Sequence, residues 1–317
     1  MKLGLVLAGG GGKGSYQMGV IKAMEHIGLT KYIQGVAGTS VGALNGALLL
    51  NGDIEKACQV WENISPNKIL SIKGRTLIEK LKGTPLEKMH DKLEIYSKRL
   101  EDYGVFSRKG MVSLIEESVD LHQLSTCDIP FYATCVEFPS MTQTYFQLNR
   151  QKPQLIQSML LATSAIPVVF PPEEIEGKLY IDGGVKDNVP IAPLYKIGCN
   201  PIIVIPLDRS YILNRSLYPD ASIYEIVPQN SLGHIVSGTL QFNREVAKRH
   251  MQDGYNDAMR ILRPAFSMLQ HEQSVFKSVQ KMAYNEQAFQ KIHTKNTLEF
   301  QKGISNLQNK IQGGYRK

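Results

Sequence analysis

A serine flanked by glycines, Gly38-Thr39-Ser40-Val41-Gly42, is the part of this 317-residue sequence whose residue types and spacing most directly suggest chemistry. The G-x-S-x-G pattern is typical of a serine nucleophile on a tight turn between a strand and a helix, because a glycine two positions away on each side relieves crowding. On this motif alone, a turn serine that caps the following helix is an equally good interpretation.

A second glycine-rich run lies upstream, where residues 9–14 read Gly-Gly-Gly-Gly-Lys-Gly. Successive glycines let the backbone turn sharply and direct N–H groups at a developing oxyanion. The helix that follows adds the positive end of its dipole, and Lys13 adds a nearby cation. The run and Ser40 together could therefore supply two parts of an acyl-transfer site.

The same glycine run formally matches the G-x-G-x-x-G fingerprint of dinucleotide-binding proteins. That fingerprint also requires an acidic residue near the end of the second strand to bind a ribose, and residues 38–40 hold no carboxylate. A phosphate-binding P-loop would need Ser or Thr after Lys13, where the chain has Gly14. A nucleotide-binding Rossmann-type protein is therefore the weaker alternative.

The best candidate for a general base is Asp182, which ends a short apolar strand and precedes two glycines. A carboxylate bonded directly to Ser40 could take the serine proton, provided that burial keeps its pKa from being too low. The competing interpretation is a plain Asp-Gly turn, which is common in proteins. None of the seven histidines stands in a glycine- or turn-rich setting that looks built for catalysis.

The elements that must position these residues follow from the hydrophobic pattern. Residues 2–8 and 32–37 are expected to be buried strands, and residues 15–27 and 41–50 helices. This order is a βαβ unit, which places the two loops at the same edge of a parallel sheet. Because only one helix and one strand separate the glycine loop from Ser40, the order differs from that of an ordinary α/β hydrolase.

The rest of the chain divides into a mixed region and a helical one. The mixed region is expected to hold a mostly helical stretch, a strand pair, a helix and two short strands, at residues 53–122, 130–138 with 142–148, 153–162, 179–181 and 201–207. From about residue 230 onward the pattern is helical and rich in Gln and Lys. We therefore expect a catalytic domain at 1–210 and a mainly helical region at 211–317.

Composition narrows the class of protein. No apolar run approaches the roughly 20 residues that cross a bilayer, and no signal peptide is visible, so a cytoplasmic location is expected. The four cysteines lack C-x-x-C spacing, which favours reduced thiols over a metal site.

The formal net charge is +7, and residues 211–317 carry 14 Lys/Arg against 8 Asp/Glu. This basic region predicts peripheral contact with an anionic membrane or self-association, and a solvated charged face is the alternative.

The glycine run, Ser40 and Asp182 together resemble the patatin-like phospholipase family over roughly residues 1–208. The motifs that carry the resemblance are G-G-G-x-K/R-G, G-x-S-x-G, a block similar to A-S-x-A-x-P, D-G-G/A and N-V-P, at residues 9–14, 38–42, 162–167, 182–184 and 188–190. Thr163 stands where many family members have Ser, and we expect no catalytic consequence. Several blocks in the right order are far more specific than any one of them.

The resemblance implies a three-layer α/β/α fold with a central, mostly parallel sheet. It implies hydrolysis of acyl esters of phospholipids or related lipids by a Ser–Asp dyad, with neither cofactor nor metal and no nucleic-acid partner. Asp182 would accept the proton of Ser40, which attacks the ester. The oxyanion-hole residues expected on this basis are Gly10, Gly11, Gly12 and Lys13. A thioesterase or general carboxylesterase with the same dyad remains open.

Overall fold

The computed structural model describes residues 2–65, 108–167, 169–233 and 242–314. Its chain divides into two compact units, residues 1–262 and 263–317. The first unit holds the β-sheet and extends past the boundary predicted at residue 210. The second continues the long helix α11 (Arg244–Gly314). Most of the stretch 53–122, predicted to be helical, lies outside the described residues.

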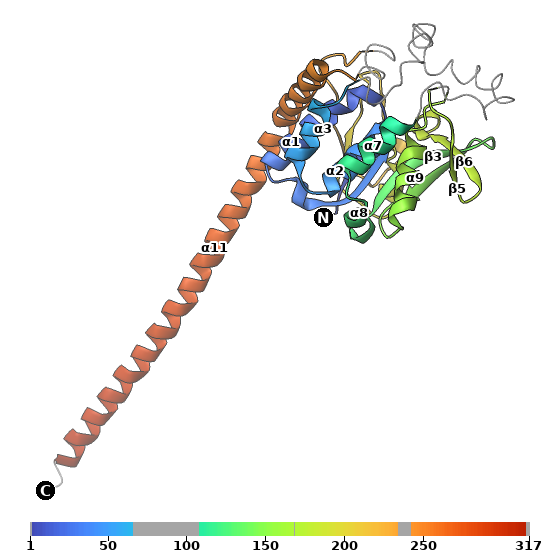
Figure 1. Ribbon diagram of the computed structural model, residues 1–317. Helices are drawn as coiled ribbons and strands as arrows, with labels where there is room; N and C mark the ends of the chain where they lie inside the picture. Colours follow the sequence, from blue (N-terminus) through green and yellow to red (C-terminus); the bar gives the residue numbers. More distant parts are fainter. Residues whose placement is uncertain (1, 66–107, 168, 234–241, 315–317) are drawn as a thin grey trace. The chain divides into compact units, whose positions relative to one another are not determined.

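A mixed eight-stranded sheet forms the centre of the first unit (Figure 1). Its strands are β1 (Leu3–Leu7), β2 (Ile33–Thr39), β3 (Phe131–Phe138), β4 (Thr142–Gln147), β5 (Glu173–Ile175), β6 (Lys178–Asp182), β7 (Ile202–Ile205) and β8 (Ile223–Glu225). They are arranged in the order β5-β6-β3-β2-β1-β7-β8, with β4 also paired to β3. Neighbours from β3 to β8 along this order run parallel, whereas β4, β5 and β6 add antiparallel pairs. The predicted mostly parallel sheet is confirmed.

Strand β1 lies at the middle of the parallel part, and all five of its residues are buried. A central parallel strand is covered on both faces, which is why it reads as a continuous apolar run. Leu7 of β1 pairs in register with Gly38 of β2. The glycine loop after β1 and the serine turn after β2 therefore leave the sheet at the same edge, as the βαβ order predicted.

Helices cover both faces of the sheet. A Cβ atom at Gly46 of α2 (Val41–Leu50) would lie 2.8 Å from Phe131 and 3.0 Å from Val36. The neighbouring Gly35 faces Leu194 of α10 (Ala192–Lys196) instead. Successive side chains of a strand point to opposite faces, so α2 and α10 lie on opposite sides. The arrangement is the predicted three-layer α/β/α fold.

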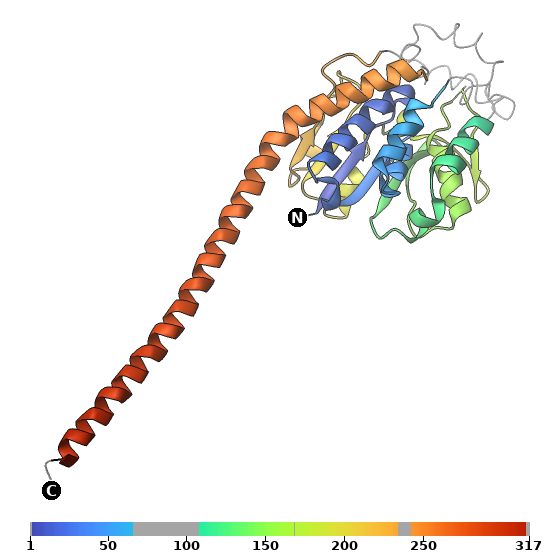
Figure 2. The ribbon, with the colours of Figure 1, turned by 60° about the vertical axis from the view of Figure 1, so that its left-hand side comes forward.

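The first turns of α11 belong to the first compact unit and run beside α1 (Ser15–His26) (Figure 2). A Cβ atom at Gly19 would lie 1.9 Å from Met251 O, and one at Gly254 would lie 2.1 Å from Tyr16 O. The two helix backbones therefore approach so closely that only glycine fits. The Tyr16 hydroxyl also donates to the buried Asp257 carboxylate at 3.0 Å.

The remaining described α-helices pack next to α2 or next to one another. They are α3 (Ile54–Glu62), α7 (Lys109–Ser118), α8 (Leu121–Thr126) and α9 (Pro153–Thr163). Helices α3 and α9 contact α2, and α7 and α8 contact α9. Two strands were not predicted, β5 and β8, because three residues are too few to show a period. Within the described ranges, no helix combines the length and apolarity needed to span a membrane.

Candidate active site

Ser40 sits on the turn between β2 and α2 with φ 55° and ψ −125°, a conformation that residues with a side chain rarely adopt. The flanking positions must be glycine because neighbouring backbone atoms leave no room for a side chain. A Cβ atom at Gly42 would lie 2.1 Å from Leu7 O, and one at Gly38 would lie 2.4 Å from Ala43 N. The Ser40 side chain makes no capping hydrogen bond to α2, which argues against the simple turn-serine interpretation.

Strand β3 brings Asp182 to this turn. Thr39, at the end of β2, pairs with Thr134 of β3, and the next residue, Cys135, pairs with Asp182 of the antiparallel β6. The general-base candidate therefore arrives beside the serine turn from the far side of β3. Ser40 and Asp182 are each only 5% exposed.

The Asp182 carboxyl has one backbone donor at this position. Its Oδ1 accepts the Gly184 N–H at 2.7 Å, and the Ser40 hydroxyl lies near enough to influence the pKa of the carboxyl. Burial raises the pKa of Asp182 to about 6, while the Ser40 hydroxyl and the Gly184 N–H act in the opposite direction. A carboxyl with this pKa is ionised at neutral pH and still basic enough to take up a proton.

The glycine loop packs directly against the serine turn. A Cβ atom at Gly9 would lie 3.3 Å from Ser40 Cβ and 2.4 Å from Asn188 Oδ1. Asn188 holds the loop through two bonds: its Nδ2 donates to Gly9 O, and its own carbonyl accepts the Gly9 N–H, both at 3.1 Å. Sequence reasoning placed Asn188 in a family motif without giving it this contact.

The predicted oxyanion residues form the start of a short 3-10 helix, Gly11–Gly14, with Gly10 at its N-cap and Gly11 at φ +55°. The first N–H groups of a helix have no acceptor within it, so they are available to a ligand. Burial lowers the pKa of the Lys13 ammonium, and the charge of Asp208 acts in the opposite direction. The structure therefore places a carboxylate, Asp208, close to the cation of the loop.

Thr163, whose replacement of the family's usual Ser was expected to have no catalytic consequence, is hydrogen-bonded to Ser40. Its Oγ1 accepts the Ser40 N–H at 2.9 Å and donates to Thr134 O at 2.6 Å, and the side chain is fully buried. The only signal in the sequence was its place in the block at 162–167. Either Ser or Thr supplies the hydroxyl that this position needs.

A buried polar network ties the glycine loop to the nucleophile helix. Asn45 of α2 donates from Nδ2 to Gly14 O and to Gln17 Oε1, each at 2.9 Å, and accepts from Trp61 Nε1 at 2.9 Å. Gln17 in turn donates to Ala8 O, at the end of β1, at 2.8 Å. Every polar atom named here has a partner, and fully satisfied networks of this kind fix the relative position of elements.

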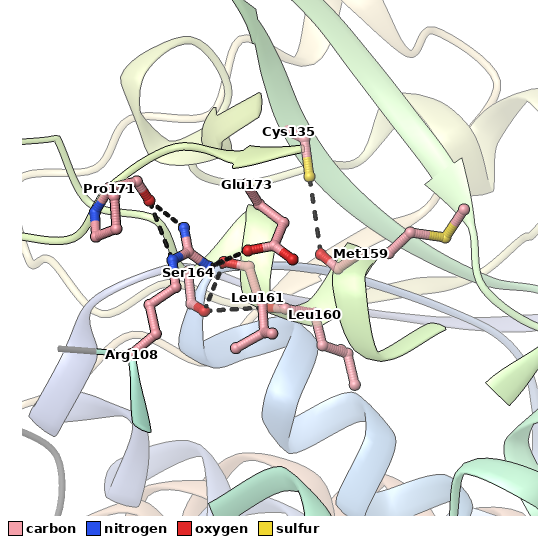
Figure 3. A network of polar contacts seen from close by, with 8 residues as sticks. All are labelled: Arg108, Cys135, Met159, Leu160, Leu161, Ser164, Pro171 and Glu173. Atoms are coloured by element: carbon pink, nitrogen blue, oxygen red, sulfur yellow. Dashed lines mark hydrogen bonds and ion pairs between the residues drawn. The ribbon is translucent and has the colours of Figure 1, made fainter. Parts of the chain in front are cut away.

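A second network holds the end of α9, which carries Thr163 (Figure 3). The Arg108 guanidinium forms an ion pair with Glu173 at 2.9 Å and donates to Leu161 O at 3.1 Å. Its Nε also donates to Pro171 O at 3.1 Å. Both charged side chains are largely buried, and burial raises the pKa of Glu173 while Arg108 opposes that shift.

A small apolar cavity of about 60 Å³ opens beside Ser40. Ser40 and Gly11 are among its lining residues, and apolar side chains of α2, α3 and α7 form much of the wall, among them Leu44, Trp61 and Met111. Its lining is apolar, and its volume is well below the roughly 300–1,000 Å³ of a typical ligand pocket. In the described part of the chain, no three His, Cys, Asp or Glu side chains lie close enough together to hold a metal ion.

Comparison with known proteins agrees with this geometry. The family model for patatin-like phospholipase matches residues 5–195. An uncharacterized NTE family protein of Mycobacterium tuberculosis is 24% identical over 209 residues, 66% of this chain and 50% of that protein. A lysophospholipase, NTE1, of Cryptococcus neoformans is 25% identical over 64% of this chain but 11% of its own length. The chain thus spans half or less of the length of these relatives.

The solved structure of VipD from Legionella pneumophila is similar in fold, with a TM-score of 0.50 and 17% sequence identity. The match covers 83% of this chain and 67% of that one.

Proposed function

The chain belongs to the patatin-like phospholipase family, and on that premise we propose that it is a serine hydrolase acting on acyl esters of phospholipids or related lipids. The observation that carries the proposal is that strand register brings the buried Asp182 carboxyl beside the buried Ser40 turn, next to an apolar cavity. A relative bearing the name lysophospholipase adds support for a lipid substrate.

In the proposed mechanism, Asp182 accepts the Ser40 proton as the serine oxygen attacks the ester carbonyl. The tetrahedral oxyanion is held by backbone N–H groups of Gly11 and Gly12, with Gly10 nearby and the positive end of α1 behind them. Collapse expels the alcohol, which takes the proton from Asp182, and leaves an acyl-enzyme. Asp182 then activates water, and the fatty acid is released.

The strained backbone of Ser40 holds the serine on the turn with its side chain free of any capping bond to α2. The Thr163 hydroxyl secures that conformation by accepting the Ser40 N–H. The dyad therefore needs no histidine, because the pKa of about 6 lets Asp182 act as the base itself.

The test measures fatty acid released from phosphatidylcholine and lysophosphatidylcholine. Ser40→Ala is expected to lower the rate by about 10⁴-fold or more. Asp182→Asn should lower it by about 10³–10⁴-fold, since the amide cannot take the proton. Matched controls are Ser140→Ala, in an exposed turn, and Asp128→Asn, whose side chain is 98% exposed. Activity that persists in Ser40→Ala would remove Ser40 from the mechanism.

The same dyad could serve a thioesterase or a general carboxylesterase. The apolar cavity at Ser40 favours an acyl chain but does not distinguish the leaving group. The three activities are distinguished by comparing rates of hydrolysis of an acyl-CoA, an aryl ester and a phospholipid that carry the same acyl chain. We expect the phospholipid to have the highest kcat/KM.

We further propose that the basic region at 211–317 brings the enzyme to an anionic membrane, with self-association as the alternative for its apolar stripes. Its charge excess of 14 Lys/Arg over 8 Asp/Glu supports this. Flotation with anionic vesicles and the size of the particle in solution separate the two. Deleting residues 263–317, the second compact unit, tests the helix itself.

A further inference from the structure

Exposed apolar side chains of the first unit gather in one segment. Among its described residues, the large apolar side chains that are exposed are Tyr32, Ile212, Leu217 and Tyr224. Three of these four lie between residues 212 and 224. Ile212 is 88% exposed and Leu217 61%. Single exposed apolar residues are ordinary, but a cluster of them marks a contact surface.

The segment that carries these side chains is held in place by specific contacts. Arg215 donates to Ile223 O at 3.0 Å and forms an ion pair with Glu225 at 2.7 Å. Tyr218 packs edge-to-face on Tyr195 with ring centroids 5.3 Å apart. The segment that exposes Ile212 and Leu217 is therefore held in a defined conformation.

The surface adjoins the candidate active site. Ile212 and Leu217 line a cavity of about 430 Å³, and two further lining residues, Asn188 and Leu207, contact the glycine loop. Asn188 bonds to Gly9, as described above, and a Cβ atom at Gly10 would lie 2.8 Å from Leu207. The cavity is thus lined in part by two residues that contact the glycine loop.

The sheet topology places the surface at the edge where substrate must enter. Strand β7 runs parallel to β1, so the residues after β7, including Ile212, leave the sheet at the same edge as the glycine loop. Tyr32 immediately precedes β2 and therefore lies at the opposite edge, away from Ser40. Ile212 and Leu217 therefore lie at the edge of the sheet that carries the glycine loop, whereas Tyr224 lies within β8.

The aromatic content fits a lipid surface. The cavity lining holds exposed Lys186 together with the carboxylates Asp187 and Asp208, and Arg209 is exposed shortly before Ile212. Tyr211 and Tyr218 are half-buried lining residues, and tyrosine is favoured where an apolar region meets polar head groups. The Asp187 carboxylate in this wall is bonded by the Tyr145 hydroxyl at 2.5 Å.

We propose that the surface formed by Tyr211, Ile212, Leu217 and Tyr218 inserts into the interfacial layer of a lipid bilayer and sets the catalytic edge against it. This rests on the proposed function, because a lipid substrate resides in that layer. Ile212 and Leu217 enter the apolar boundary, while Lys186 and Arg209 lie at the head groups. The surface is distinct from the basic helix, whose contribution is electrostatic.

The experiment measures binding, so it does not depend on hydrolysis. Ser40→Ala chain is mixed with phosphatidylcholine vesicles containing phosphatidylglycerol, and the partition coefficient is determined by flotation. Ile212→Asp and Leu217→Asp are each expected to weaken partitioning about tenfold or more, since each removes one buried aliphatic side chain. The matched controls are Tyr32→Asp, at the opposite edge, and Ile212→Leu, and both should stay within about twofold of the parent.

Salt separates insertion from electrostatic attraction. At about 0.5 M NaCl, exposed charges are screened within a few ångströms, and the difference between Ile212→Asp and the parent should persist. The proposal is overturned if the parent does not bind vesicles or if both Asp variants bind like the parent. It is also overturned if Tyr32→Asp weakens partitioning as much as Ile212→Asp does. It is also overturned if Ile212→Asp abolishes dimerisation in solution while vesicle binding is unchanged. Fatty acid release, measured separately, decides the proposed function.

Discussion

The backbone N–H of Ser40 donates a 2.9 Å hydrogen bond to the hydroxyl of Thr163, which in turn donates to the Thr134 carbonyl at 2.6 Å. The residue that carries the proposed nucleophile is thereby tied to the neighbouring strand β3 and to the end of α9. A residue in a strained conformation persists only where its surroundings fix it, and this bond is one of the contacts that do so.

Thr163→Val should impair catalysis, because it leaves the Ser40 N–H and the Thr134 carbonyl without partners. We expect kcat to fall by about tenfold or more and the free energy of unfolding to drop by about 1–3 kcal/mol. Thr163→Ser keeps the hydroxyl and should retain most of kcat. A fall in KM alone, or equal loss in the Ser variant, would contradict the positioning role.

The rate should rise with pH through an inflection near pH 6. Burial raises the pKa of Asp182 to about 6, and the proposed base must be ionised to accept the Ser40 proton. The measurement is kcat/KM against pH, which reports the free enzyme. His250→Gln serves as the control, since burial lowers the pKa of that histidine. An inflection that disappears in His250→Gln would assign the titration to the histidine.

Asp182→Asn should be inactive yet more stable than the parent at pH 7 to 8. A carboxyl whose folded pKa is raised from 3.8 to about 6 destabilises the folded state once the pH exceeds both values. The folded state binds more protons between these values, so stability falls as pH rises through this window. We expect a gain in the variant of about 3 kcal/mol at pH 8, vanishing below about pH 4. Denaturant titrations at several pH values provide the check, and a pH-independent difference would contradict it.

Asn45→Leu should destabilise the fold and misplace the glycine loop. The variant leaves Gly14 O, Gln17 Oε1 and Trp61 Nε1 unpaired in the interior. The expected loss is about 3 kcal/mol or more in the free energy of unfolding, with a fall in kcat larger than any change in KM. Gln59→Ala, exposed on α3, is the control and should leave both unchanged. Normal kcat in a folded Asn45→Leu enzyme would show that the network does not position the loop.

Arg108→Gln should destabilise the end of α9, because it leaves the buried Glu173 carboxylate without its ion pair. We expect a loss of about 3 kcal/mol, since an unpaired buried charge is costly. Adding Glu173→Gln should restore part of it, and the double-mutant cycle measures the coupling. Lys178→Gln breaks the exposed pair with Glu137 and should barely move the Tm. Additive effects of Arg108→Gln and Glu173→Gln would show that the pair is not coupled.

The local sequence pattern was enough to predict a strand or helix where the element is long and is buried along its whole length. The predicted strand at 2–8 is β1, and the predicted helix at 41–50 is α2 with the same bounds. Their continuous apolar runs reflect burial on both faces of a parallel sheet. The helical pattern expected from about residue 230 is observed from Arg244 onward.

The sequence pattern did not predict elements that depend on contacts with other parts of the chain. Strands β5 and β8 are three residues each and exist through pairing with β6 and β7. The compact unit that contains the sheet ends at Leu262, because Gly19 and Gly254 allow the start of α11 to pack on α1. No local pattern around residue 250 indicates that two glycines far apart in sequence will meet.

The sequence alone determined the chemical groups of the candidate site and their common edge. Glycines beside Ser40, a glycine loop before a helix, and a βαβ order place serine and loop together, since parallel strands end at one edge. Only the tertiary structure decided that Asp182 lies beside the turn of Ser40, because that depends on the register of β2 with β3 and of β3 with β6. It also decided the pKa of Asp182, since desolvation is a property of the packed interior and of no single residue.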